Sequence, residues 1–160
     1  MRLTVCAVGK LRSGPEAALV NDYAARISAT GRSLGFPAFD IKEVEAPRGL
    51  TGPKRRDAET ALLLDASPNK GICIVLDEHG KDLPSEMLAK KLGAWRDDGI
   101  GYASFFIGGA DGHSQSLLTK ADIKIAFGKA TWPHMLVRAM LCEQIYRAMT
   151  ILSGHPYHRA

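Results

Sequence analysis

The residues best suited to chemistry gather in the last third of the chain. An apolar run ends in a glycine turn at Gly108–Gly112, and a helical pattern that begins at Pro133 carries His134 and Arg138. The chain then finishes with the segment 155–159, which reads His-Pro-Tyr-His-Arg. Imidazole, phenol and guanidinium groups can exchange protons or hold anions. This part of the sequence is therefore predicted to form the functional site.

Arg138 falls in the middle of the apolar arc of this last helix, between Ile145 and Met149 on a helical projection. Burying an unpaired guanidinium is costly, so Arg138 needs an anionic partner or a polar cavity. A structural ion pair is one interpretation. In the other, Arg138 lies at the mouth of a site, where it holds a phosphate or carboxylate or polarises a base oxygen.

Several familiar motifs are absent or incomplete. Gly9–Gly14 has the outer glycine spacing of a phosphate-binding loop, but Pro15 and Glu16 replace the required Lys-Ser/Thr pair. No Gly-x-Gly-x-x-Gly occurs, which disfavours a dinucleotide site. A hydrolase finds little support because there is no Gly-x-Ser-x-Gly elbow and Cys73 lies inside a strand pattern. The terminal His-x-x-His lacks cysteine or carboxylate neighbours, so no metal site is expected.

The segment Ala46–Arg56 stands out as a predicted loop. It holds two prolines, two glycines and the basic run Lys54, Arg55 and Arg56. Such a loop is either a solvated surface segment or a phosphate-contacting loop on an RNA substrate.

Strand and helix patterns alternate along the whole chain and predict one α/β domain over residues 1–160. Unbroken apolar strands separated by helices are typical of a mainly parallel sheet covered on both faces. The predicted strands lie at 3–8, 39–44, 72–76, 103–107 and 123–128, and the helices around 20–27, 61–64, 88–95 and 133–152.

The composition agrees with a folded cytoplasmic protein. No apolar run approaches the roughly 20 residues that a membrane helix needs, and the N-terminus lacks a secretion signal. Cys6, Cys73 and Cys142 are far apart in apolar runs, which indicates buried thiols in a reducing compartment. The net charge of +4 is compatible with a phosphate-bearing partner.

The last helix is apolar around most of its circumference, with only a narrow stripe of Glu143, Arg147 and Thr150. Such a helix lies either in the centre of the core or against a second subunit. For a helix at the edge of the sheet in a domain of this size, a symmetric homodimer is the simpler expectation.

Four short motifs at matching spacing resemble the ribosomal RNA large subunit methyltransferase H family of the SPOUT superfamily, and the resemblance spans the whole chain. The motifs are Ile107-Gly108-Gly109-x-x-Gly112, Pro133-His134-x-x-x-Arg138, Glu143-Gln144-x-Tyr146-Arg147-Ala148 and His155-Pro156-Tyr157-His158-Arg159.

This resemblance implies a C-terminal deep trefoil knot, a homodimer, and S-adenosylmethionine held in the knot largely by backbone groups of three loops. The chain departs from the family at Gly128, where members usually have serine, and so lacks one side-chain contact to the cofactor. Carried over position by position, the cofactor residues are Leu76, Gly108, Gly109, Phe127, Gly128, Lys129, Ala130, Thr131 and Trp132.

The resemblance also implies methylation of N3 of a pseudouridine in 23S large-subunit ribosomal RNA, with the assembled ribosome presenting the target. Our hypothesis gives Arg138 the stabilisation of negative charge on the base and gives His134 the pocket floor. Tyr157 and His158 of the partner subunit's tail would hold the nucleotide and accept its proton. Candidate phosphate contacts are Lys54, Arg55, Arg56 and Arg159. The alternative is a non-catalytic ribosome-binding or assembly factor on the same fold.

Overall fold

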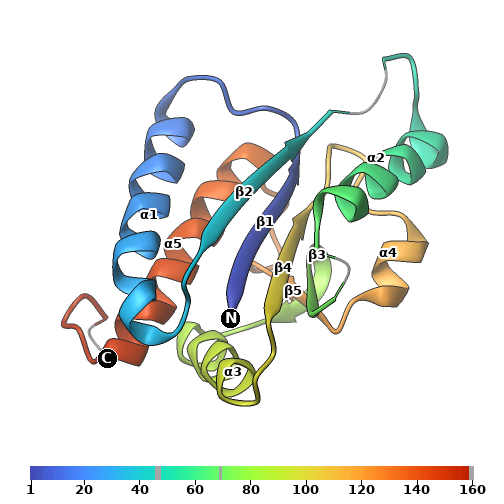
Figure 1. Cartoon of the computed structure of the whole chain (residues 1–160). Helices are drawn as coiled ribbons and strands as arrows, with labels where there is room; N and C mark the ends of the chain where they lie inside the picture. The colour runs from blue at the N-terminus through green and yellow to red at the C-terminus, as the bar shows by residue number, and fades with distance from the viewer. Residues whose placement is uncertain (46–47, 69, 159–160) are drawn as a thin grey trace.

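The computed structural model describes residues 1–45, 48–68 and 70–158. Its described residues form a five-stranded sheet in the order β2-β1-β4-β3-β5, and every neighbouring pair is parallel (Figure 1). The strands are β1 (Arg2–Val8), β2 (Phe39–Val44), β3 (Ile72–Asp82), β4 (Tyr102–Ile107) and β5 (Ile123–Ala126). The predicted parallel α/β architecture is confirmed.

Helices cover both faces of the sheet (Figure 1). The core on one face joins alternate strand residues such as Val5 and Phe105 to α1, α3 and α5, and the other joins Cys6 and Phe106 to α2 and α4. The strands read as continuous apolar runs because each of their faces is buried. The helices are α1 (Pro15–Gly31), α2 (Gly52–Ala66), α3 (Ser85–Asp97), α4 (Gln115–Lys120) and α5 (His134–Ser153), and a 3-10 turn, η1 (Arg32–Leu34), follows α1. None of the described helices is long and apolar enough to cross a membrane.

Helix α5 lies between α1 and α3 on one face of the sheet rather than at its edge. Leu141, Ile145 and Met149 are almost fully buried within the single chain. Of the two expected places for this apolar helix, the chain itself provides the first, because α1, α3 and the sheet cover most of its circumference. The homodimer stays a prediction.

The predicted loop at 46–56 is shorter than expected. Helix α2 already begins at Gly52, after Thr51 in an extended conformation and with Pro53 in its first turn. Proline suits this position because its fixed φ matches the helix and its missing N–H would have no helical partner. The basic run at 54–56 is thus helical, while residues 46 and 47 lie outside the described part of the chain.

Two further features were missed in the sequence. The short helix α4 was not predicted, and β3 continues to Asp82, well past the apolar run that ends at Leu76. The pairing of β3 with β5 shifts register between Leu76 and Lys81, so the intervening residues bulge out of the ladder. A bulge of this kind re-aims side chains at the end of a strand.

Gly71, immediately before β3, lies against Tyr102 of β4 and gives a test of how the starts of these two strands pack. Its φ is +123°, and an added Cβ would lie 2.2 Å from the carbonyl oxygen of Tyr102. We expect Gly71→Ala to lower the free energy of unfolding by about 3 kcal/mol, through left-handed strain and overpacking together. Gly99→Ala is the matched control, because Gly99 also has a positive φ, +77°, but faces open space. That change should cost only about 1 kcal/mol in urea unfolding; equal losses would contradict the packing.

Candidate active site

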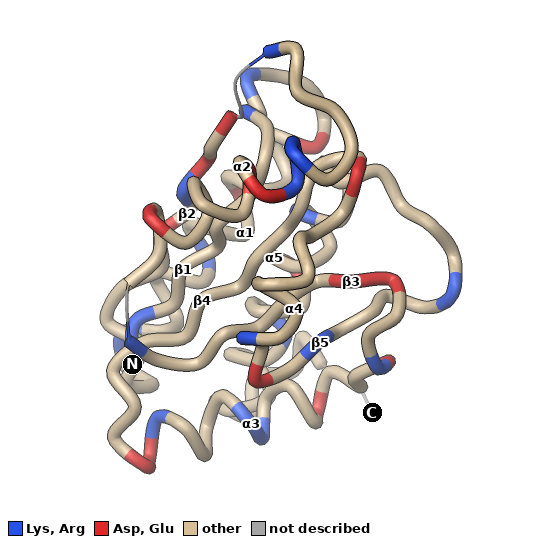
Figure 2. The backbone as a smooth tube through the Cα atoms, turned by 90° about the vertical axis from the view of Figure 1, so that its right-hand side faces the viewer, with Lys and Arg blue, Asp and Glu red and all other residues tan. Residues whose placement is uncertain are grey.

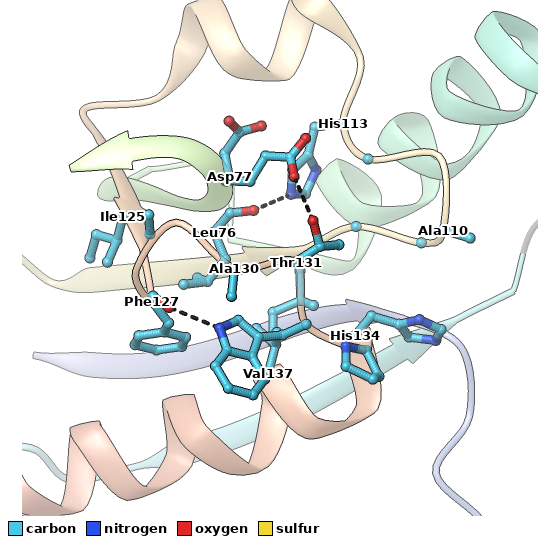
Figure 3. Close-up of a pocket in the computed structure, with 18 of the residues that line it drawn as sticks. Leu76, Asp77, Ala110, His113, Ile125, Phe127, Ala130, Thr131, His134 and Val137 are labelled. Carbon is cyan, nitrogen blue, oxygen red and sulfur yellow. Dashed lines mark hydrogen bonds between the residues drawn. The ribbon is translucent and has the colours of Figure 1, made fainter. Parts of the chain in front are cut away.

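A cavity of about 590 Å³ opens at the carboxyl ends of β4 and β5, beside the middle of β3 (Figure 3). Three separate segments line it: residues 76–78 from β3, 107–113 after β4, and most of 125–134 with the start of α5. The volume lies within the range of small-molecule sites, roughly 300–1,000 Å³. The cavity is therefore large enough for a nucleoside-sized ligand.

The cavity gathers residues that the sequence placed in three distant loops. Eight of the nine expected cofactor residues line it: Leu76, Gly108, Gly109, Phe127, Gly128, Ala130, Thr131 and Trp132. Lys129 does not line the cavity, and its side chain is exposed. Among the residues expected to do chemistry, His134 lines the wall, and burial together with the nearby Arg138 charge lowers its pKa.

The charged side chains of the cavity were missed by sequence reasoning. Asp77, Glu78 and Asp111 line it, and no lysine or arginine of the described residues does so. Figure 2 shows the acidic residues on the latter part of β3. Acids that directly follow a buried parallel strand are a usable signal, because ligands bind at the carboxyl ends of such strands. An acidic lining favours a cationic ligand in a chain that is basic overall.

The loop at 127–132 is tied to β3 and to itself. The backbone N–H of Gly128 donates to Asp82 Oδ1 at 2.9 Å, and Thr131 Oγ1 donates to Glu78 Oε2 at 3.3 Å. The indole of Trp132 donates to the carbonyl of Phe127 at 2.9 Å (Figure 3). These contacts hold the loop against the cavity with its backbone available to a ligand.

His113 lines the cavity and is tied to β3 by a hydrogen bond. It is buried, and its Nε2 lies 3.1 Å from the carbonyl oxygen of Leu76 (Figure 3). Because a carbonyl can only accept, Nε2 carries the proton of the neutral ring. Burial lowers the pKa of His113, which keeps the ring in this neutral form.

Helix α2 buttresses the glycine turn. A Cβ at Gly109 would lie 2.8 Å from the carboxylate of Glu59, so a larger residue there would require the Glu59 side chain to shift. Arg55 Nε donates to Glu59 Oε1 at 2.8 Å and lies 4.0 Å from Asp111. Arg55, expected as a phosphate contact, is therefore engaged with carboxylates of its own chain.

Arg138 is fully buried and does not line the cavity. Nη1 donates to Glu43 Oε1 at 2.5 Å, and Nη2 donates to the carbonyls of Val8 and Gly9 at 3.1 and 2.9 Å. The geometry agrees with the first of the two interpretations of Arg138, a structural ion pair. The geometry does not bring the guanidinium to the ligand cavity.

The C-terminal tail lies outside the cavity of its own chain. Tyr157 packs on Tyr146 with ring centroids 4.9 Å apart, and its hydroxyl donates to Glu143 at 3.1 Å. His158 Nε2 lies 3.3 Å from Glu86. The tail folds back along α5, so that the Tyr157 hydroxyl lies beside Glu143, nine residues or about 14 Å of helix from His134. Neither Tyr157 nor His158 lines the cavity. Arg159 lies outside the described residues.

The terminal histidines form no metal centre here. Among the described residues, no group of three or more His, Cys, Asp or Glu side chains lies close enough together to hold a metal ion.

Cys6 and Cys142 are buried and Cys73 half-buried, and all three are free thiols. Burial raises the pKa of Cys73 to about 11 and that of the other two to about 12, which makes them poor nucleophiles.

Comparison with known proteins identifies the family of this chain. Residues 1–158 match the protein family described as "Predicted SPOUT methyltransferase". The chain therefore belongs to the SPOUT methyltransferases. A solved SpoU methyltransferase, AviRb from Streptomyces viridochromogenes, aligns with 96% of this chain and 60% of its own at 14% identity, with a TM-score of 0.40.

Full-length relatives narrow the assignment. The chain is 50% identical over 160 residues to the ribosomal RNA large subunit methyltransferase H of Bradyrhizobium diazoefficiens, with both chains covered entirely. It is 50% identical to the protein of the same name from Nitrobacter winogradskyi and 49% identical to that of Rhodopseudomonas palustris BisB18, again over 99–100% of each chain. It is thus a member of the ribosomal RNA large subunit methyltransferase H family, and the resemblance of its motifs is confirmed.

The buried His113 predicts a pH dependence of stability. Its pKa in the folded protein lies below the ordinary 6.5, so below pH 6.5 the unfolded chain binds more protons at this residue. His113 should therefore lower the free energy of unfolding as the pH falls, by up to about 1.4 kcal/mol per pH unit.

Urea unfolding between pH 7.5 and 5.5 should show a smaller loss for His113→Gln than for the wild type. His134 titrates in the same direction but is present in both proteins, so the difference between them isolates His113. Identical pH profiles would contradict a neutral, buried His113.

Proposed function

We propose that this protein methylates N3 of a pseudouridine in 23S large-subunit ribosomal RNA with S-adenosylmethionine as the methyl donor. The observation that carries the proposal is the single cavity that joins residues 76–78, 107–113 and 125–134 in a chain whose full-length relatives are named for large-subunit ribosomal RNA methylation. The remaining cavity residues and the tail then receive roles within that reaction.

The residues of the cavity fit S-adenosylmethionine. This cofactor supplies an electrophilic methyl group on a positively charged sulfonium. Asp77, Glu78 and Asp111 complement its net positive charge. Gly108 and Gly109 line the cavity, and a flat adenine ring would lie against this turn. The residues that would hold the cofactor are the eight cavity-lining residues already named.

The acceptor nitrogen sets the second requirement. An imide N3–H is a weak acid and must lose its proton before N3 can act as a nucleophile. A positioned proton acceptor and a positive charge near the base oxygens would favour that loss. We assign the proton transfer to Tyr157 or His158 of the partner subunit's tail and the pocket floor to His134.

Arg138 receives a positioning role in place of direct contact with the base. Its Nη1 donates to Glu43 and its Nη2 donates to the carbonyls of Val8 and Gly9, while its buried Nε has no hydrogen-bond partner among the described residues. It begins the second turn of α5, four residues after His134. Arg138 would therefore fix the end of β1 against His134 and contribute its charge through the wall of the site.

A homodimer would complete the site. Neither Tyr157 nor His158 lines the cavity of its own chain, where contacts with Glu143 and Glu86 hold them instead. Helix α5 keeps a half-exposed row that includes Leu136, Met140 and Ile151, and Trp132 at the cavity is 42% exposed. This surface suits a second copy of the chain, whose tail would then lie over the cavity.

The knot and the substrate context belong to the same proposal. Residues 127–134 line one cavity with residues 76–78 and 107–113, an arrangement compatible with threading of the C-terminal segment through the preceding loops. The residues that recognise RNA would belong to the surface of this domain. The assembled ribosome in the cytoplasm would then present the target, with Lys54 and Arg56 among the phosphate contacts.

Methyl transfer from labelled S-adenosylmethionine tests the function. The purified protein is given free large-subunit RNA or intact ribosomes that lack the modification. Label on N3 of a pseudouridine, with ribosomes preferred, is the expected result. Cofactor binding without transfer to ribosomal RNA would contradict the substrate. Neither binding nor transfer would favour the non-catalytic assembly factor.

Removal of the tail separates its proposed role from folding. A chain that ends at Gly154 should remain dimeric by sedimentation and bind the cofactor, but lose methyl transfer at least 100-fold, because the proton acceptors are gone. Retained transfer would exclude the tail from the reaction.

Mixed dimers test whether the tail acts in the partner's site. Ala130→Trp places an indole in the cavity and should inactivate the cofactor site while leaving the tail intact. Exchange of truncated subunits with Ala130→Trp subunits should restore about a quarter of wild-type activity, since half of the dimers carry one complete site. No recovery would mean that the tail serves the cavity of its own chain.

A further inference from the structure

A second cavity, of about 420 Å³, lies at the carboxyl ends of β1 and β2. Val8 and Gly9 end β1 at this cavity, and Arg12 and Arg48 contribute exposed guanidinium groups. Helix α2 closes it with Arg55 and Glu59. Figure 2 shows basic and acidic residues mixed around the start of α2, unlike the acidic end of β3.

This position lies beside the place where the sheet topology favours a ligand. The chain leaves β1 through α1 on one face of the sheet and leaves β4 through α4 on the opposite face (Figure 1). Strands β1 and β4 are neighbours, so their carboxyl ends form the switch point of an open α/β sheet. Ligands of such sheets bind in the crevice outside that point.

The two cavities share a wall. A side chain at Gly9, in the second cavity, would lie 3.3 Å from Nε2 of His134, which lines the first cavity. Gly109 of the first cavity likewise approaches the carboxylate of Glu59, which lines the second. A molecule in the second cavity would therefore lie directly beside the cofactor cavity.

Glu59 indicates what kind of molecule would bind. Its side chain is 2% exposed, and Oε1 accepts from Arg55. Oε2 has no hydrogen-bond partner in the part of the chain that the structure describes. A buried carboxylate oxygen without a donor is costly, so an N–H group of a ligand would relieve that cost.

The guanidinium groups indicate the other end of the ligand. Arg12 and Arg48 present planar donors that match a phosphate. Glu45 also lines the cavity, and it forms an ion pair with Lys10 at 3.5 Å, which partly offsets its repulsion of an anion. A ligand with one N–H face and one phosphate is a nucleotide with an imide or lactam base.

We propose that the second cavity binds the nucleotide that flanks the methylated one, with its base N–H toward Glu59 and its phosphate at Arg12 and Arg48. The RNA identity of this ligand rests on the proposed function, whereas the nucleotide site itself does not. Binding there would place the neighbouring nucleotide of the strand against the wall shared with the cofactor cavity.

Three probes test the site on the full-length protein by titration calorimetry and amide chemical shifts. Uridine 5′-monophosphate has both recognised groups, 3-methyluridine 5′-monophosphate lacks the imide N–H, and uridine lacks the phosphate. Uridine 5′-monophosphate should bind at about millimolar Kd and at least 5-fold more tightly than either analogue. The shifts should centre on residues 8–12 and 55–59.

Variants assign each contact. Glu59→Gln keeps the shape and the Arg55 contact but turns a donor toward the base, so it should abolish the preference over the 3-methyl analogue. Arg12→Ala should weaken uridine 5′-monophosphate at least 3-fold and leave uridine unchanged. Lys90→Ala, which removes an exposed charge on α3 away from the cavity, is the matched control and should alter neither.

The outcomes separate this site from the proposed function. Equal binding of all three probes, or binding insensitive to Glu59→Gln and Arg12→Ala, would overturn the second site. A Glu59→Gln protein that loses S-adenosylmethionine affinity in parallel would also overturn it, because Glu59 would then act only through Gly109. If the expected nucleotide binding is observed but ribosomal RNA receives no methyl group, the site stands and the proposed function fails.

Discussion

The buried guanidinium of Arg138 is the interaction on which the arrangement of the site depends. It joins the start of α5 to Glu43 of β2 and to the carbonyls of Val8 and Gly9 at the end of β1. A buried charge is tolerated only when its partners are held in place, and removal of one partner typically costs about 3–5 kcal/mol. This interaction fixes the first turns of α5, and with them His134 in the wall of the first cavity.

Around that fixed point the chain separates its charges. The first cavity is lined by carboxylates and suits a cationic ligand, whereas the second presents arginines beside one unpartnered carboxylate oxygen. Glycines at 9 and 109 keep the wall between them thin enough for His134 and Glu59 to approach it from opposite sides. A methyl donor and an RNA strand need two such neighbouring environments, since proximity of donor and acceptor supplies much of the rate enhancement.

Within one chain, the C-terminal tail and the first cavity are separate. Tyr157 and His158 make contacts with Glu143 and Glu86 in their own chain, and neither side chain lines the cavity. Their groups are suited to proton transfer, but their place in one chain gives them no cofactor to act on. A second copy, placed against the half-exposed row of α5, would bring tail and cavity together.

The sequence by itself determined those features of the protein that a local pattern of residues encodes. Strand periods predicted the parallel sheet, and four short motifs identified the family and the three loops, because strands buried on both faces and glycine turns leave direct traces in composition. Tertiary structure decided the rest. In the folded chain, Arg138 pairs with Glu43, which is 95 residues away in the sequence, and α5 is buried between α1 and α3. Tertiary structure also brought Glu59 against Gly109. Such pairings depend on how distant elements pack, and a buried charge specifies only that a partner must exist.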